Sequence, residues 1–383
     1  MEIPFHKVDI TEEDIDAVVE SMRSGWLTMG PRTFEFEKLF AAFLEKEEAV
    51  AVSSCTAALH LALVAEDIGP GDEVIIPVTT FVATSEAVLY TGAKPVFADI
   101  KKDDHTIDAD HVRRLVTEKT RAIIPVHYAG NAADMDQIMQ IAAEHNLVVI
   151  EDVAHAFPAT YKGRALGTIG DYGCFSFYAT KTITTGEGGM IVGADSGKLD
   201  RIRSLRLHGI TRDAWNRYGK GGSSVYDVNE NGYKYNMTDT AAALGLSQLR
   251  RCGSSLQKRQ QIAKIYDKYF SDNPYILPYK IENYVECAFH LYPLRINIDE
   301  LKIDRHNFSK KLLEKGVSSS LHFIPFYEFS YYKDRLDAYK YPGADWVYKR
   351  EISLPIYPGL SDNEVNHVAE TVVETAEDCV KGR

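Results

Sequence analysis

The 383-residue sequence is poor in cysteine, in long apolar runs and in positive charge. Its five cysteines are odd in number and scattered, and no two form a CxxC pair, which excludes a disulfide scaffold and a zinc ribbon and suits a reducing cytosol. No charge-free apolar run reaches the roughly 18 residues of a membrane span. The formal net charge of −12 argues against a nucleic-acid or anionic-membrane partner held by bulk charge.

Several common motifs are missing as well. The N-terminal segment MEIPFHKVDITEED is acidic and mixed, where a secretory signal would be basic and then apolar, so we expect a cytoplasmic protein. The histidines show no HExxH or similar spacing, and no metal site is predicted. The glycines of GEGGM (186–190) lack the spacing of a nucleotide-binding loop.

What the sequence does contain is an alternation of short apolar runs and helical stretches over its first two thirds. The runs lie at 47–54, 72–78, 94–100, 121–127, 146–152, 173–178 and 188–194. Most are apolar on both faces, as in parallel strands covered by helices on each side. The pattern predicts an α/β protein with a doubly wound, mostly parallel sheet.

The pattern changes toward residue 250. A glycine-rich polar stretch at 212–235 has neither helical nor strand periodicity, and an apolar helix is predicted at 240–251. The elements predicted beyond it are helices near 254–272, at 304–316 and from about 361, and a strand near 288–298. We therefore predict a large domain over 1–250 and a smaller α+β domain over 251–383.

Polar residues follow three of the apolar runs, where open α/β sheets bind their ligands. Thr56 begins a helix whose free N–H groups can hold a phosphate, Asp152 ends the fifth run, and Lys181 follows the sixth by three residues. A phosphate site, a carboxylate and a lysine together suit pyridoxal phosphate, which needs a Schiff-base lysine and a partner for its ring nitrogen. Taken singly, Asp152 is more typical of a helix cap and Lys181 of a surface lysine.

Three longer motifs make a family resemblance specific: EDVAHAFPATYKG (151–163), GDYGCFSFYATKTITTGEGGMIV (170–192) and GYKYNMTDTAAALGLSQL (232–249). They resemble the DegT/DnrJ/EryC1/StrS family of sugar aminotransferases, and the match extends from SGWLTMGP (24–31) to LPIYPGLSDNEV (354–365). The resemblance implies a fold-type-I pyridoxal-phosphate-dependent transferase and a homodimer with shared active sites.

The resemblance also implies roles for individual residues. Lys181 falls on the Schiff-base lysine and Asp152 on the partner of the pyridine nitrogen. The other implied cofactor contacts are Thr56, Ala57 and Ser176 at the phosphate, Phe81 stacked on the ring, His155 at the 3-hydroxyl side, and Asn236 at the phosphate of the neighbouring subunit. Thr28 and His322 are the candidates for substrate contacts.

Two residues depart from the family pattern, since Cys55 replaces a common glycine and His155 a common glutamine. Lysine at position 181, instead of the histidine of the family's dehydratases, favours transamination. We expect transfer of an amino group, from L-glutamate, to C4 of a nucleotide-linked keto-deoxy sugar, because LRLHGITRDAWNRY (205–218) resembles enzymes that aminate UDP-linked 4-keto sugars. A cyclitol or other non-nucleotide keto substrate stays open, as does a non-catalytic regulator that keeps the cofactor site.

Overall fold

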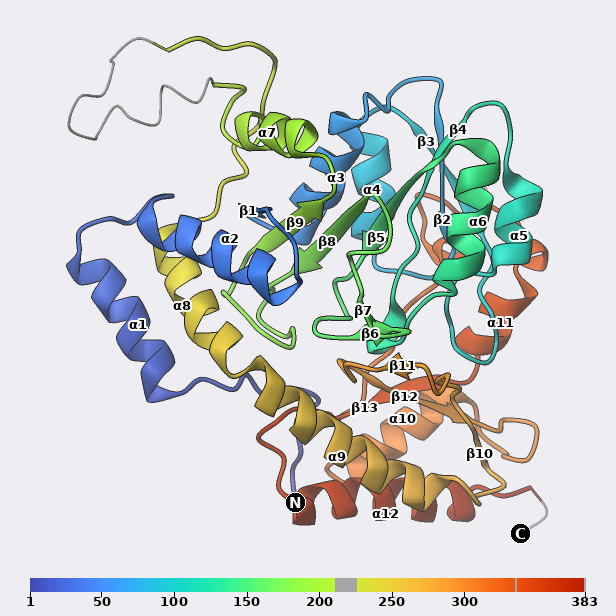
Figure 1. Ribbon diagram of the computed structural model, residues 1–383. Coiled ribbons are helices and arrows are strands. Elements are labelled where there is room, and N and C mark those ends of the chain that lie inside the picture. The colour runs from blue at the N-terminus through green and yellow to red at the C-terminus, as the bar shows by residue number, and fades with distance from the viewer. Residues whose placement is uncertain (211–225, 335, 382–383) are drawn as a thin grey trace.

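The computed structural model describes residues 1–210, 226–334 and 336–381, and a seven-stranded sheet forms the centre of its larger part (Figure 1). In sheet order, the strands are β1 (Ala49–Val52), β9 (Gly189–Gly193), β8 (Tyr172–Ser176), β5 (Val148–Asp152), β4 (Thr120–Ile123), β2 (Glu73–Pro77) and β3 (Lys94–Ala98). Neighbouring strands from β8 to β3 are parallel, whereas β9 is antiparallel to both β1 and β8. The predicted mostly parallel sheet is confirmed, with one strand reversed.

Helices cover both faces of this sheet, because successive strand residues point to opposite sides. In β1, Val50 and Val52 belong to one hydrophobic cluster, and Ala49 and Ala51 belong to the other. The Val50 side is covered by α3 (Cys55–Ala65), α4 (Val82–Tyr90) and α7 (Ser196–Leu205). The Ala49 side is covered by α2 (Pro31–Phe43), α5 (Ala109–Leu115), α6 (Met135–His145) and α8 (Asp239–Arg250). The doubly wound arrangement is therefore present.

Two helices connect the large sheet with the rest of the chain. Helix α8 packs along α1 (Glu12–Arg23) and α2, and Arg251 separates it from the 19-residue helix α9 (Cys252–Phe270). Figure 1 shows α9 running on from α8 toward the lower part of the molecule. The predicted helices 240–251 and 254–272 correspond to this pair.

The lower part is built on a second, antiparallel sheet (Figure 1). Its strands are β10 (Ile276–Leu277), β12 (Tyr292–Ile296) and β13 (Glu351–Leu354), and helices α9, α10 (Arg305–Glu314) and α12 (Asp362–Asp378) pack on it. A small third sheet combines β11 (Val285–Glu286) with β6 (Thr160–Tyr161) and β7 (Arg164–Ala165). The predicted strand 288–298 contains β12, while β13 was not predicted.

Packing crosses the predicted domain boundary in both directions. Ile3 lies in the hydrophobic cluster of the lower part and pairs with Val317. Conversely, Phe326 and Val347 of α11 (Pro342–Tyr348) belong to the hydrophobic cluster on the Val50 side of the large sheet. The division at residue 250 stays a prediction. The N-terminal segment around Ile3 packs in the lower part, and the segments around Phe326 and Val347 pack against the large sheet.

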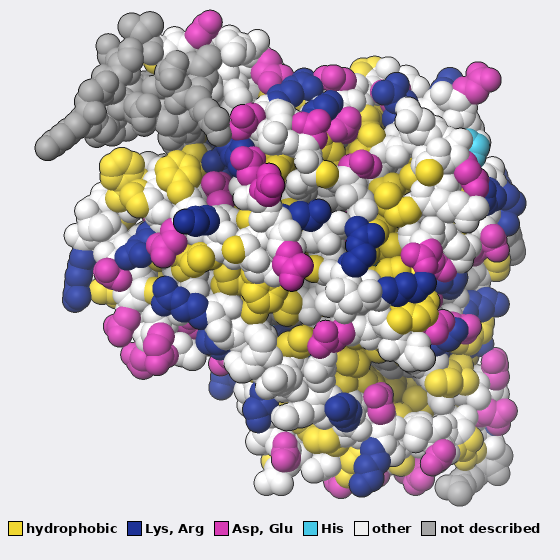
Figure 2. Space-filling model, in the orientation of Figure 1, with side chains coloured by type: hydrophobic (Ala, Val, Ile, Leu, Met, Phe, Trp, Pro, Cys, Tyr) yellow, Lys and Arg dark blue, Asp and Glu magenta, His cyan; other side chains and the backbone are white. Residues whose placement is uncertain are grey.

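Of the predicted polar stretch 212–235, residues 212–225 lie outside the described part of the chain. The remainder of this stretch is held by isolated bridges, since Val228 pairs with Ile210, and Lys234 pairs with Leu207. On the face shown in Figure 2, acidic and basic side chains are interspersed. The five cysteines are free and buried. Within the described part of the chain, no helix has the length and apolar character needed to cross a membrane.

Candidate active site

A cavity of about 460 Å³ lies beyond the carboxyl ends of β1, β2, β4, β5 and β8. The parallel strands place the residues that follow them at one edge of the sheet, which is where such sheets bind ligands. Most of the predicted site residues line this cavity: Thr56, Phe81, Asp152, His155, Ser176, Lys181 and His322. The sheet topology thus brings together residues that are far apart in the sequence.

Asp152, the last residue of β5, is held rigidly and is almost completely buried. Its Oδ2 accepts a hydrogen bond from Thr84 Oγ1 at 3.0 Å, and its Oδ1 accepts one from the Ala154 N–H at 3.1 Å. Burial raises the pKa of Asp152, although these hydrogen bonds and the positive charge of Lys181 act in the opposite direction. A carboxylate in this environment is stabilised further by any cation placed beside it.

Lys181 is half-buried on the turn after β8, where its backbone N–H donates to the Tyr178 carbonyl at 2.9 Å. Desolvation lowers the pKa of Lys181 to about 8, while Cys55 and Asp152 act to raise it. A substantial fraction of the amine is therefore neutral near pH 8 and can act as a nucleophile or as a base.

Three imidazole rings and one phenyl ring form another wall of the cavity. The His155 ring stacks on Phe323 with centroids 5.5 Å apart and lies 4.5 Å from the His290 ring. Burial lowers the pKa values of His155 and His290, and the charge of Lys181 contributes in both cases. The Ala129 N–H donates to His155 Nδ1 at 3.4 Å, so the neutral ring carries its proton on Nε2. His155 can thus donate a hydrogen bond to a ligand.

The opposite end of the cavity is formed by the start of α3. Ser54 is the N-cap of this helix and accepts from the Ala57 N–H at 3.1 Å, while Thr56 and Ser176 line the cavity beside it. A Cβ on Gly189 would lie 2.5 Å from the Ser54 carbonyl carbon, so only glycine lets β9 approach this closely. Helix N-termini offer N–H groups to anions, and this one suits a phosphate.

Three predicted site residues do not line the cavity of this chain. Ala57 is buried one residue further along α3. Thr28 is exposed, and its backbone carbonyl accepts a hydrogen bond from the Asp239 N–H at 3.2 Å. Asn236 bridges to Val52, and its Nδ2 donates to the Met237 carbonyl. Their proposed roles stay predictions, and that of Asn236 requires a second subunit.

Other residues at the cavity were not predicted. Thr84, Phe323 and His290 come from α4 and from loops of the lower part. In the sequence, the only indication that Thr84 belongs to the site was its position three residues after Phe81, at the start of a helix. Cys55, which departs from the family pattern, places its Sγ 3.5 Å from the Cys174 carbonyl and 4.0 Å from Asp152 Oδ1. The thiol therefore lies against the Asp152 carboxylate.

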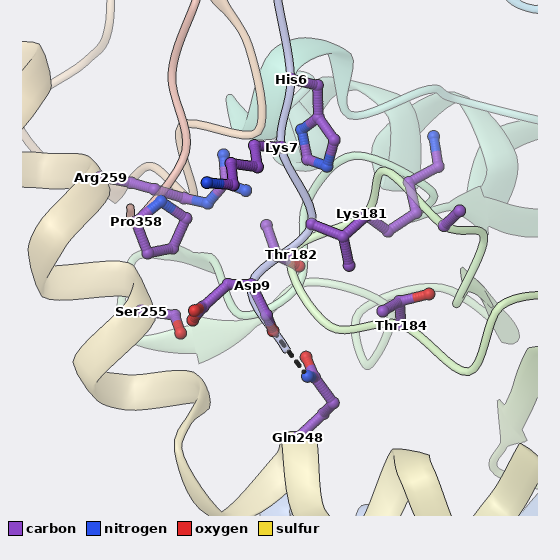
Figure 3. Close-up of a pocket in the computed structure, with 12 residues that line it drawn as sticks. His6, Lys7, Asp9, Lys181, Thr182, Thr184, Gln248, Ser255, Arg259 and Pro358 are labelled. Carbon is purple, nitrogen blue, oxygen red and sulfur yellow. Dashed lines mark hydrogen bonds between the residues drawn. The ribbon is translucent and has the colours of Figure 1, made fainter. Parts of the chain in front are cut away.

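Lys181 also borders a narrow hollow on the other side of its loop, formed with the N-terminal segment (Figure 3). There Gln248 Nε2 donates to the Asp9 carbonyl at 3.1 Å, and the Lys181 side chain extends away from both residues. The hollow measures about 10 Å³, room for about one water molecule, and is too small for a substrate. No group of three or more His, Cys, Asp or Glu side chains in the described ranges could hold a metal ion.

Comparisons with known proteins agree with this geometry. Residues 8–373 match the DegT/DnrJ/EryC1/StrS aminotransferase family. The chain is 44% identical to the spore coat polysaccharide biosynthesis protein SpsC of Bacillus subtilis over 384 residues, covering 99% of this chain and 97% of that protein.

Solved structures are also similar. A putative sugar aminotransferase of Streptococcus pneumoniae, Spr1654, superposes with a TM-score of 0.91 at 37% identity, covering 99% of each chain in its PLP form. Helicobacter pylori PseC, an aminotransferase of pseudoaminic acid biosynthesis, has a TM-score of 0.91 at 31% identity and covers 99% of this chain and 100% of its own. These findings confirm the predicted fold type, the pyridoxal phosphate cofactor and the enzyme class, a sugar aminotransferase. The chain belongs to the DegT/DnrJ/EryC1/StrS aminotransferase family.

Proposed function

We propose that this enzyme transfers the amino group of L-glutamate to C4 of a nucleotide-linked keto-deoxy sugar. The observation that carries the proposal is the pair formed by Lys181, with its lowered pKa, and the buried carboxylate of Asp152 in one cavity at the edge of the sheet. A protein that only sensed a ligand would need neither a nucleophilic amine nor a buried carboxylate. The pair therefore favours catalysis over a regulatory role.

The cavity residues fit pyridoxal phosphate. Thr56 and Ser176 would hold the phosphate at the start of α3, and Asp152 would lie beside the pyridine nitrogen. His155 can donate from Nε2 toward the 3-hydroxyl side, and the exposed ring of Phe81 would cover one face. When bound, the cofactor supplies an electron-withdrawing ring and the carbonyl that carries the amino group between the two substrates.

Lys181 would act twice in this reaction. Its neutral Nζ would hold the cofactor, and once displaced by a substrate amine it would move a proton to and from the substrate carbon. Asp152 would stay ionised and keep the ring nitrogen protonated, because a cation at its side lowers the pKa of a buried carboxyl. Two oppositely perturbed groups thus take two separate roles.

The finer substrate assignment rests on resemblance. The segment 205–218 supports C4 amination of a UDP-linked 4-keto sugar, and its residues from 211 on lie outside those described. SpsC is named for polysaccharide biosynthesis and PseC for pseudoaminic acid biosynthesis, which supports a sugar substrate of this kind. The cytoplasmic location stays a prediction.

The active unit in this proposal is a homodimer. Large apolar side chains are exposed along α1 and α2 and in the turn between them: Ile15, Met22, Trp26, Leu27, Phe34, Leu39 and Phe43. So many exposed large apolar side chains, on two helices that both pack on α8, are typical of a protein interface. Asn236 lies outside the cavity of its own chain and would reach the phosphate of the partner's site.

The assignment is tested on the purified chain loaded with pyridoxal phosphate. We expect glutamate to bleach its yellow colour, and a UDP-linked 4-keto sugar to restore it with formation of an amino sugar that mass spectrometry detects. The panel includes 3-keto sugars, other nucleotides, a cyclitol ketone and glutamine as donor. Amination of the cyclitol alone would favour the alternative substrate class, and a colour indifferent to every amine would favour a binding role.

A further inference from the structure

A buried carboxylate lies behind the cavity wall and takes no part in the chemistry described above. Glu351, at the start of β13, is completely buried. Its Oε1 accepts from Ser353 Oγ at 2.6 Å and from Tyr128 OH at 3.3 Å, and its Oε2 accepts from the His322 N–H at 3.2 Å. Three donors from three segments of the chain converge on this one group.

Ser353 connects the carboxylate to the cavity. Its Oγ lies 2.8 Å from His322 Nδ1, and His322 lines the cavity. A serine hydroxyl has a single hydrogen. When this hydrogen goes to ionised Glu351, the oxygen can only accept from His322, so Nδ1 carries the ring proton and Nε2 is left as an acceptor for a ligand.

We propose that Glu351 and Ser353 are positioning residues that set the tautomer of His322 and, through it, exchange one proton with the active-site cavity. The inference rests on the proposed function for its role in catalysis, but its structural content concerns only these three side chains. It assigns a task to Glu351 and Ser353, which lie behind the cavity and do not touch a ligand.

The proton balance of this exchange is simple. A proton from the cavity binds His322 Nε2, the Nδ1 proton passes to Ser353 Oγ, and the Ser353 hydrogen passes to Glu351 Oε1. Each group except Glu351 ends with as many protons as before, and the carboxylate becomes neutral. Oε2 still accepts from the His322 N–H, so the backbone contact survives. His322 Nε2 has changed from an acceptor into a donor.

The surroundings favour this route over a charged imidazole. Burial, with the charge of Lys181, lowers the pKa of His322 to about 4, whereas burial raises the pKa of Glu351 to about 7. Three ionisable groups lie near the hydrogen-bonded side chains of Glu351, Ser353 and His322. They are Tyr128 beside Glu351, Arg305 of α10, and Arg295 of β12, which pairs with Glu351. His155 and His290 lie on the cavity side, and the pKa values of both are lowered. A proton entering at His322 therefore rests on Glu351.

The change matters for a keto sugar. A keto oxygen only accepts hydrogen bonds, so it is held by the Nε2–H form that neutral Glu351 produces. A hydroxyl or an amine can donate to the bare Nε2 that ionised Glu351 produces. The same ring can thus serve substrate and product in turn without carrying a charge.

The test reads the tautomer directly. The full chain, loaded with pyridoxal phosphate and labelled with 15N-histidine, is titrated by NMR from pH 6 to 8, and the His322→Asn variant identifies the His322 signals. We expect the proton on Nδ1 at high pH and on Nε2 at low pH, with a midpoint near the Glu351 pKa of about 7. A wild-type tautomer that is constant over this range, or an imidazolium at low pH, would overturn the proposal.

Variants locate the relay. Glu351→Gln and Ser353→Ala should each abolish the pH dependence, while Ser353→Thr, which keeps the hydroxyl, should retain it. Ser320→Ala is the matched control, because Ser320 pairs with Ser353 through the backbone and its side chain is not part of the proposed relay. A Ser353→Ala protein that titrates like the wild type would contradict the relay. The experiment measures the tautomer and not turnover. Its result therefore tests the relay even if the proposed substrate is wrong.

Discussion

At the scale of single residues, the proposed site contains two groups whose pKa values burial moves in opposite directions. Desolvation lowers the pKa of Lys181 to about 8 and raises that of Asp152. Lysine is thereby made available as a neutral amine, and the carboxyl is prepared to gain from a neighbouring cation. Groups with oppositely perturbed pKa values mark the division of acid and base roles in an active site.

Replacing Lys181 tests the first role. We expect Lys181→Ala to bind pyridoxal phosphate weakly, to lose the borohydride-trappable adduct and to lose nearly all turnover, because no other lysine among the described residues lines the cavity. Peptide mapping of the trapped wild-type adduct is the measurement. An adduct on a different lysine would show that the assignment is wrong, and Lys162→Ala, at an exposed lysine, serves as the control.

Asp152→Asn tests the second role, since it keeps the shape and removes the charge. Acid–base contributions of this kind change rates by about 10²–10⁴-fold, and a loss of that size is expected in the rate at which glutamate bleaches the holoenzyme. Thr84→Val, which removes the donor to Oδ2 and leaves the carboxylate, should lose less. Near-normal activity in Asp152→Asn would mean that the side chain serves only the turn at Ala154.

At the scale of elements, one carboxylate connects the starts of two helices that lie far apart in the sequence. Gly30, the N-cap of α2, has no side chain to cap that helix. Asp239, the first residue of α8, supplies the missing acceptor, since it receives the N–H groups of Gly30, Arg32 and Thr33 at 2.7, 3.0 and 2.9 Å. The Thr33 hydroxyl donates to it as well, at 2.7 Å.

Asp239→Ala leaves these buried donors without an acceptor. Each buried donor left unpaired costs about 1–3 kcal/mol, so the free energy of unfolding measured by denaturant titration should fall by at least about 3 kcal/mol. Asp239→Asn should lose less, because one oxygen remains. Asp108→Ala, at the exposed local cap of α5, provides the comparison at about 1 kcal/mol. An equal loss at both positions would contradict a link between the two helices.

At the scale of the whole molecule, the chain places Asn236 outside its own cavity while α1 and α2 expose an apolar surface. Both features are explained if two chains complete each other's sites. The proposed contact with a charged phosphate contributes on the order of 1.5–3 kcal/mol, so Asn236→Ala should bind the cofactor markedly less well.

Mixing variants tests the shared site. In a mixed dimer of Asn236→Ala and Lys181→Ala, one site carries both defects, and the other receives Lys181 from one chain and Asn236 from its partner. We expect activity above that of either parent when cofactor is limiting. No recovery, despite subunit exchange shown by mass spectrometry of differently tagged chains, would mean that Asn236 acts within its own chain.

Local sequence pattern determines where the strands of the large sheet lie, but not their direction. All seven strands of the large sheet were predicted, because each lies in or overlaps a short, mostly apolar run of the sequence. The reversed direction of β9 was not, since a strand's direction depends on the path of its connection. The short strands β6, β7, β10 and β11 have two residues each, too few for a period.

The same distinction holds at the site. The sequence by itself determined that Asp152 ends a buried strand and that Lys181 follows another, because both positions are set by local sequence. Only the tertiary structure decided that Thr84 and His290 join them at the cavity and that Glu351 lies behind His322, since these residues come from segments that no periodicity connects. It also decided the pKa shifts, because desolvation depends on which neighbours exclude water from a side chain, and folding alone brings those neighbours together.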